Sequence, residues 1–238
     1  MISERGKIKV IILDDHQGII DGYLYRLSGA SNIEVVATIH YGDELEPALA
    51  KHAANILILD IQVPVSAENK NPYPILNVIP KVLSNYPGLA VLVISMHAQR
   101  TLIKAVLDAG ASGYILKDDP SSIRELAAII KLVVDGGIHF SPAVFKTVMN
   151  PSGSEFSHPL YPRELEALTL CAAYPDESST QIARRMNIEN STVRNILSGV
   201  YLKLGVRTRA AAIAKAIQME LVSQDKLPKN LGVFNRDD

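Results

Sequence analysis

The 238-residue chain has no tryptophan, one cysteine and few aromatic residues. A single cysteine, Cys171, cannot build a disulfide framework or a cysteine metal cluster within the chain, which fits a reducing compartment. No apolar segment approaches the roughly 18 residues of a membrane span, and the first residues lack the pattern of a signal peptide. We therefore expect a cytoplasmic protein that does not bind a membrane.

A large net charge is also missing, because 24 basic and 25 acidic residues nearly cancel to -1. Positive charge gathers locally between residues 184 and 215, where seven Lys and Arg side chains face only Glu189. A solvated basic face explains this as well as a polyanion-binding surface does. The total charge alone therefore does not identify a partner.

The first part of the chain alternates short runs of Val, Ile and Leu with longer segments of helical periodicity. The expected strands are residues 10–14, 34–38, 56–60, 90–95 and 113–117. Such alternation is typical of βαβ units with a parallel sheet. The sequence predicts a doubly wound, flavodoxin-like α/β domain with five parallel strands over residues 1–135.

Polar residues end four of these strands. Asp14 and Asp15 end the first, Asp60 the third, Ser95 the fourth and Lys117 the fifth. Each alone is explained more simply as a helix cap or loop residue, but doubly wound folds bind ligands at this edge of the sheet. The five together predict a functional site.

The chemistry of this set is consistent with phosphoryl transfer. Adjacent carboxylates repel each other, and three that converge form a hard oxygen site that suits Mg²⁺. Asp60 would be the nucleophile, and the Lys117 ammonium would neutralise charge on the transferred oxygens. The Ser95 hydroxyl would donate a hydrogen bond to the phosphoryl group.

The segments LDDH, LDIQVP, VIS and AGASGYILK resemble the receiver domain of two-component response regulators, over residues 7 to about 135. The resemblance implies that Asp60 is the phosphoacceptor and that Ser95 and Lys117 are the switch hydroxyl and the phosphate-binding lysine. It also implies that Asp14 and Asp15 hold Mg²⁺.

The same resemblance implies two further roles and shows one departure. The backbone carbonyl of Gln62 and the side chain of Asp60 would complete the metal site, and Tyr114 would swing inward in the phosphorylated state. Receivers usually continue after the phosphoacceptor as x-x-M-P-x-x-x-G, whereas IQVPVSAENKNPYPIL has Val63, no glycine and about six extra residues. We expect a lengthened surface loop beside the site.

A second domain follows a break in the pattern. The segment NPSGSEFSHP gathers Pro, Gly and Ser, so the sequence predicts a linker over residues 136–157. Short helical segments without strands then predict a small all-α domain over 158–222, and 223–238 is left as a C-terminal tail.

Two adjoining helices carry the DNA-binding prediction. Ser178 and Gln181 form a capping box for the first, and Ser191 is expected to cap the second. Arg194, Asn195 and Ser198 lie off the apolar stripe of the second helix, near its start, as base-reading residues of a helix-turn-helix do.

The surrounding sequence, LYPRELEALTL and QIARRMNIENSTVRNILSGVYLKLGVRTRAAA, resembles the DNA-binding domain of LuxR-type regulators. Joined to a receiver, it resembles the NarL/FixJ family of response regulators. The resemblance implies that Arg194, Asn195 and Ser198 face bases, while Lys203 and Arg163 contact phosphates or support the domain.

The resulting prediction is a DNA-binding transcriptional response regulator of a two-component system, switched by phosphorylation of Asp60. Its expected partners are a cognate histidine kinase, double-stranded promoter DNA and a second copy of the chain, and its expected cofactor is Mg²⁺. It would be no enzyme beyond its own phosphoryl transfer and dephosphorylation. Two alternatives are a phosphorylation-independent regulator that uses the receiver as a dimerisation scaffold, and an aspartyl-phosphate phosphohydrolase. The second is disfavoured because Gln62 stands where such enzymes place an acid/base carboxylate.

Overall fold

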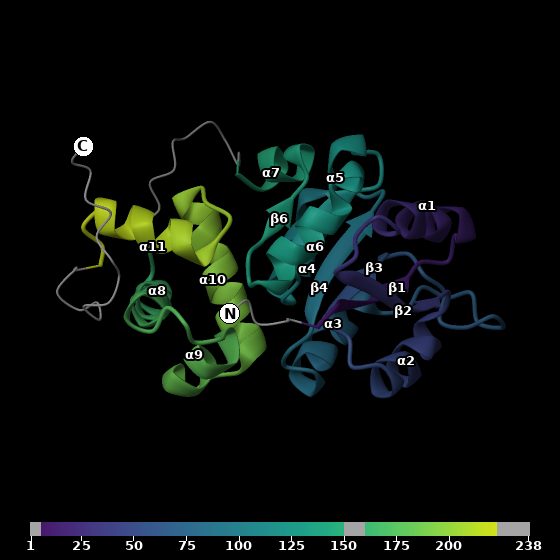
Figure 1. Ribbon diagram of the computed structural model, residues 1–238, viewed down its shortest axis with the longest axis horizontal. Coiled ribbons are helices and arrows are strands. Elements are labelled where there is room, and N and C mark those ends of the chain that lie inside the picture. Colours follow the sequence, from purple (N-terminus) through teal and green to yellow (C-terminus); the bar gives the residue numbers. More distant parts are fainter. Residues whose placement is uncertain (1–5, 150–159, 223–238) are drawn as a thin grey trace.

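The computed structural model describes residues 6–149 and 160–222, which form an α/β domain and a helical domain lying side by side (Figure 1). The predicted tail and the linker residues from 150 onward lie outside these ranges. Within them, no helix combines the length and the apolar character needed to cross a membrane.

The α/β domain is built on one parallel sheet with strand order β2-β1-β3-β4-β5-β6. Its strands are β1 (Ile8–Leu13), β2 (Ile33–Ile39), β3 (Ile56–Leu59), β4 (Ala90–Ser95), β5 (Gly113–Leu116) and β6 (His139–Phe140). The five expected strands are all present. The strand count of five was wrong, because β6 adds a sixth at the edge, where Gly113 and Tyr114 pair with His139 and Phe140.

The central strands form because their runs of Val, Ile and Leu are buried on both faces. Every residue of β3, β4 and β5 is buried, while the edge strand β2 is only partly so. Parallel strands covered by helices on both sides read as continuous apolar runs for this reason.

Helices cover both faces of the sheet. One face carries α1 (Gln17–Leu27), α5 (Pro120–Arg124) and α6 (Leu126–Val134). The other carries α2 (Leu45–Lys51), α3 (Ile75–Asn85), α4 (Arg100–Asp108) and α7 (Pro142–Met149). The buried apolar residues on this second face form one contiguous cluster with the core of the helical domain.

The first domain extends further than the sequence predicted. The expected linker began at residue 136, but residues 139–149 form β6 and α7, and Phe140 and Val144 are buried in the main core. The boundary at 135 was therefore too early. A two-residue strand has no periodicity, so no pattern marked it.

The helical domain comprises α8 (Pro162–Ala173), α9 (Ser179–Met186), α10 (Asn190–Leu204) and α11 (Arg209–Gln218). The expected capping box of α9 is present: Gln181 N–H donates to Ser178 Oγ, and Ser178 N–H donates to Gln181 Oε1. The expected cap of α10 was wrong, because this helix begins at Asn190 with Glu189 at the N-cap position. The turn between α9 and α10 passes through Asn187 in the left-handed conformation, which asparagine tolerates.

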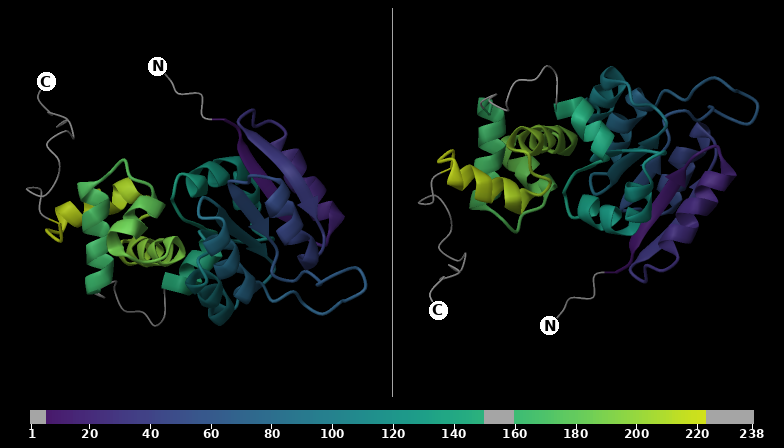
Figure 2. Two further views of the ribbon diagram at one scale, coloured as in Figure 1. Left: turned by 90° about the horizontal axis from the view of Figure 1, so that it is seen from below. Right: turned by 90° about the horizontal axis from the view of Figure 1, so that it is seen from above.

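The lengthened segment after β3 is a hairpin that folds back on the domain. It is closed by an antiparallel bridge between Pro64 and Pro72, and it projects away from the helical domain (Figure 2). Gly42 N–H donates to the Pro64 carbonyl, and Tyr73 packs directly over Gly42. The hairpin is therefore fastened to the segment after β2.

Gly42→Ala tests this attachment. A methyl group at residue 42 would overlap the Tyr73 ring, so the free energy of unfolding should fall by about 1–3 kcal/mol, as for an overpacked site. Gly22→Ala, in α1 with open space around it, is the control and should be neutral or stabilising by up to about 1 kcal/mol. Chemical denaturation of both variants measures the difference, and equal effects would contradict the close packing.

Candidate functional site

The predicted site residues lie together because backbone hydrogen bonds extend the sheet by one residue beyond the strands. Asp14 N–H donates to the Ile39 carbonyl, Asp60 N–H to that of Leu13 and Lys117 N–H to that of Ser95. These three predicted site residues are thus held at the carboxyl edge of the sheet, where they were expected.

Lys117 occupies the centre of the site. Its Nζ lies 2.7 Å from Asp14 Oδ2 and 2.7 Å from Asp60 Oδ2, and all three side chains are at most 7% exposed. Burial acts to lower the pKa of Lys117, but hydrogen bonds and charge from the two carboxylates outweigh it and raise the pKa. For Asp14 burial dominates over the lysine, so the pKa of that carboxyl is raised.

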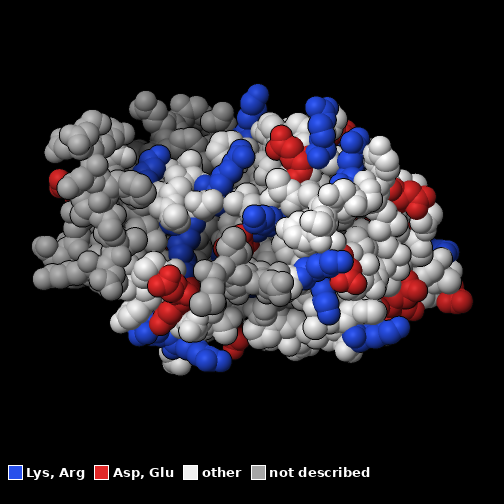
Figure 3. Space-filling view, viewed as in Figure 1, with Lys and Arg blue, Asp and Glu red and all other residues white. Residues whose placement is uncertain are grey.

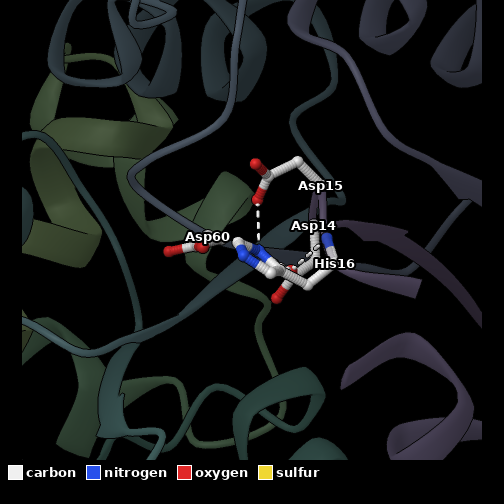
Figure 4. A group of neighbouring side chains, drawn as sticks. All are labelled: Asp14, Asp15, His16 and Asp60. Carbon is white, nitrogen blue, oxygen red and sulfur yellow. Dashed lines mark hydrogen bonds and ion pairs between the residues drawn. The ribbon is translucent and has the colours of Figure 1, made fainter. Parts of the chain in front are cut away.

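A second set of contacts forms an acidic cluster of Asp14, Asp15, His16 and Asp60, whose ligand atoms all lie within 4.8 Å of one another (Figure 4). Three carboxylates against one lysine leave two unbalanced negative charges, which suits a divalent cation. Asp15 Oδ1 is shielded from solvent, and His16 Nδ1 lies 2.7 Å from it. The donor set therefore fits a hard metal ion.

The predicted switch residues lie on two successive strands: Ser95 ends β4, which pairs with β3, and Tyr114 lies on β5, which pairs with β4. Ser95 is fully buried, and its Oγ accepts a hydrogen bond of 3.3 Å from His97 N–H. Tyr114 is also fully buried and donates to the His97 carbonyl at 2.7 Å, so it already occupies the inward position; burial raises its pKa to about 12. Both side chains hold the loop that leads into α4.

Gln62 lies beside the acidic cluster but is exposed. Its backbone N–H approaches Asp60 Oδ1 at 3.4 Å. A pocket of about 650 Å³ lies beside the acidic cluster. Asp15 and Gln62 line one side of it, and Lys70 and Tyr73 of the hairpin line the other. The extra residues therefore narrow the approach to the site from this side.

The predicted DNA-reading residues contact the first domain. Arg194 donates to the backbone carbonyls of Leu89 and Pro87, and Asn195 donates to the Asp108 carbonyl at 2.7 Å. Burial lowers the pKa of the Arg194 guanidinium to about 10. The face of α10 that lies off its own core is thus covered by α3, α4 and the loop before β4.

The other residues predicted to contact DNA differ in how far their side chains are exposed and free to bind it. Ser198 is buried at the domain junction. Lys203 lies 2.6 Å from Glu164 and over the ring of Tyr161, so it supports the helical domain from within. Arg163 is 65% exposed and pairs only with Glu166 among the described residues.

Basic side chains do not form one continuous patch on the face in Figure 3. Lys and Arg are spread over both domains and alternate there with acidic residues.

Three residues of these sites were missed in the sequence. His16 follows the acidic pair directly, and its residue type is the signal that was available. Asn190 donates to the Pro87 carbonyl, but it was placed before the start of its helix. His97 contributes only backbone groups, which no sequence pattern reveals.

Comparisons with known proteins agree with this geometry. The family model for the response regulator receiver domain matches residues 10–131, and that for bacterial regulatory proteins of the luxR family matches residues 158–216. The chain is a response regulator. It combines a receiver with a LuxR-type DNA-binding domain, as the resemblance implied.

Relatives share both domains of this response regulator. Transcriptional regulatory protein MctR of Rhizobium johnstonii is 30% identical over 94% of this chain and 99% of its own length. RcsB from Salmonella enterica serovar Typhimurium, bound to promoter rprA, is 25% identical with a TM-score of 0.51, over 88% of this chain and 98% of its own. A structure of two RcsB dimers bound to two parallel DNAs is 24% identical with a TM-score of 0.53, over 92% and 100%.

The raised pKa of Asp14 predicts that its charged carboxylate lowers the free energy of unfolding, and that this effect depends on pH. Above its folded pKa the carboxylate is charged at the expense of native stability, so Asp14→Asn should raise the free energy of unfolding at pH 7 in metal-free buffer. The gain should fade as the pH falls toward the ordinary carboxyl range, where wild-type Asp14 is protonated too. Denaturation curves from pH 4 to 8 measure it.

Asp118→Asn removes an exposed carboxylate next to the site and is the matched control. This substitution should change the free energy of unfolding by no more than about 0.5 kcal/mol at every pH from 4 to 8. A loss of stability in Asp14→Asn at pH 7 would contradict the assignment of burial as the dominant influence on this carboxyl.

Proposed function

We propose that phosphorylation of Asp60 switches this response regulator between a form in which the receiver covers α10 and a form in which α10 reads promoter DNA. The observation that carries the proposal is the double role of α10: its base-reading candidates, Arg194 and Asn195, are the residues that bind the receiver. A helix cannot offer the same donors to backbone carbonyls and to bases at once.

The phosphoryl donor is a phosphohistidine of a cognate histidine kinase. An oxygen of the Asp60 carboxylate attacks phosphorus, the P–N bond breaks, and the histidine leaves with the bonding electron pair. Lys117, already 2.7 Å from Asp60, neutralises charge on the transferred oxygens. Ser95 offers its hydroxyl to one of them.

The cofactor would be Mg²⁺, held by the carboxylates of Asp14, Asp15 and Asp60 and by the backbone carbonyl of Gln62. When bound, Mg²⁺ neutralises negative charge on phosphoryl oxygens. The two unbalanced carboxylate charges of the acidic cluster support this assignment.

The coupling runs from Ser95 to α10 through α4. Ser95 Oγ and Tyr114 Oη both bond to His97, which lies just before α4, and the Asp108 carbonyl at the end of α4 accepts from Asn195. If Ser95 Oγ turns to a phosphoryl oxygen, His97 loses one anchor and α4 shifts. Tyr114 already lies inward here, so its inward swing alone does not release α10.

The released form binds DNA as a homodimer on a two-fold related site in the cytoplasm. The chain's catalysis is limited to its own phosphoryl transfer and dephosphorylation. Gln62, in place of an acid/base carboxylate two residues after Asp60, supports this over steady phosphohydrolase activity. A regulator independent of phosphate remains the second candidate, favoured by the hairpin that narrows the site.

Asp60→Asn should abolish phosphorylation while it keeps the fold. Wild-type protein incubated with Mg²⁺ and acetyl phosphate should gain one phosphoryl mass and bind promoter DNA more tightly, and the variant should do neither. Intact mass and DNA affinity are measured on the same sample.

Asp21→Asn, on the exposed side of α1, is the control and should behave as wild type. Phosphorylation of Asp60→Asn would refute the site. A phosphoryl gain in wild type without a change in DNA affinity would favour the phosphate-independent candidate.

Asn195→Ala should relax base preference at one position, with a loss of about 1–3 kcal/mol there and an unchanged salt slope. Arg163→Ala removes an exposed phosphate-contact candidate, so it should lower the salt slope by about one unit and keep the preferred sequence. Binding of the phosphorylated proteins to randomised sites at several salt concentrations separates the two. The same base preference in wild type and Asn195→Ala would show that α10 is not the reader.

A further inference from the structure

A crevice of about 240 Å³ lies at the junction of the two domains, between α4 of the receiver and α10 of the helical domain. Arg100 and Lys104 of α4 line one wall, and Asn195 and Ser198 of α10 line the other. The crevice is separate from the acidic cluster around Asp60, since no residue of that cluster lines it. Its chemistry therefore needs an explanation of its own.

Positive charge in the crevice is not balanced by the protein. Arg100 and Lys104 are both exposed, and neither forms an ion pair with a carboxylate of the described residues. Asp108, one turn beyond Lys104, also lines the crevice and forms no ion pair there. One guanidinium and one ammonium against one carboxylate leave the crevice positive.

The placement of these two cations is unfavourable for α4 itself. Arg100 is the first residue of the helix, and no acidic residue lies in the first turn. The amino end of a helix carries partial positive charge, and like charges four positions apart on a helix repel each other. Helix stability therefore does not account for Arg100 and Lys104, whereas an anion in the crevice would offset both effects.

The opposite wall supplies a buried hydroxyl group without a partner. Ser198 is only 7% exposed, and its Oγ forms no hydrogen bond with any described residue. Thr147 and Thr169, by contrast, donate to the carbonyl four residues earlier in their own helices. Buried polar groups are normally hydrogen-bonded, so the free Ser198 hydroxyl points to a ligand in the crevice.

We propose that this crevice binds a small phosphate dianion, either inorganic phosphate or the phosphate group of a small phosphomonoester, and that the ligand stabilises the form in which the receiver covers α10. The inference rests on the covered form of the proposed function and adds an effector that acts on it. A tetrahedral phosphate has enough oxygens to accept from Arg100, Lys104 and Ser198 at once. The volume lies below the range of about 300–1,000 Å³ for drug-sized ligands, which excludes large phosphate esters.

Such a ligand would act on DNA binding because its donors come from both domains. When α10 leaves the receiver, Ser198 separates from Arg100 and Lys104, and the site no longer exists. A ligand that binds one form shifts the population toward that form. Phosphate and promoter DNA must then weaken each other's binding by the same factor.

The simpler explanation is that Arg100 and Lys104 are hydrated surface cations. Phosphate would then act through ionic strength alone, and loss of either cation would have the same effect as loss of any other exposed lysine. A site predicts an effect confined to the residues that line the crevice.

The test titrates unphosphorylated full-length protein with inorganic phosphate and, in parallel, with glycerol 3-phosphate by isothermal titration calorimetry. Ionic strength is constant and the buffer is metal-free, so that the acidic cluster repels anions. Arg100→Gln and Lys104→Gln should each weaken binding by about tenfold or more, as for the loss of a hydrogen bond between charged groups. Lys131→Gln removes an exposed lysine from α6, on the other face of the sheet, and should bind as wild type. Tighter binding of glycerol 3-phosphate supports a phosphomonoester as the ligand, and tighter binding of inorganic phosphate supports the free ion.

Affinity for promoter DNA, measured on the same unphosphorylated proteins, is the second readout. Saturating phosphate at constant ionic strength should weaken it in the wild type and in Lys131→Gln, and leave it unchanged in Arg100→Gln and Lys104→Gln. Absence of phosphate binding to the wild type, equal binding by all four proteins, or binding without an effect on DNA affinity would overturn the inference. Failure of Asp60 to accept a phosphoryl group would overturn the proposed function alone, because neither readout uses phosphorylated protein.

Discussion

The receiver depends on one buried cation, the Lys117 ammonium held between Asp14 and Asp60. Without it the carboxyl edge of the sheet would gather three carboxylates in a confined space, two of them almost fully buried. The lysine lowers this cost but leaves the pKa of Asp14 raised, so the site is incompletely neutralised. That residual negative charge suits a divalent cation.

Much of the receiver could be predicted because its determinants are local. Runs such as IKVIIL and AVLVIS mark buried parallel strands, and the polar residue after each run must lie at the same sheet edge. The two-residue strand β6 was not predicted, because its position depends on pairing with Gly113 and Tyr114, which are distant in sequence. The start of α10 was misplaced by two residues, because Ser191 looked like a better cap than Glu189.

The contacts of α10 illustrate what sequence cannot reveal. Its apolar stripe predicted which face packs in its own domain, and the structure agrees, since Val193, Leu197 and Leu204 are buried. The opposite face was expected to be exposed and free to bind DNA. Instead, its side-chain donors form hydrogen bonds with backbone carbonyls of residues more than 80 positions away in the chain. Lys203 likewise forms an ion pair with Glu164 of its own domain. A long, flexible lysine side chain pairs with whichever carboxylate lies nearest in the folded protein, and the sequence does not show which one that is.

The acceptors that receive Arg194 and Asn195 are all main-chain oxygens, at Pro87, Leu89 and Asp108. Every residue type carries such an oxygen, so substitution of these receiver side chains leaves the acceptors in place. Over evolutionary time the receiver surface can therefore diverge in sequence while it still covers α10. Variants that uncouple the domains should concentrate where the backbone path itself changes, at insertions, deletions and prolines around the loop before β4 and the end of α4.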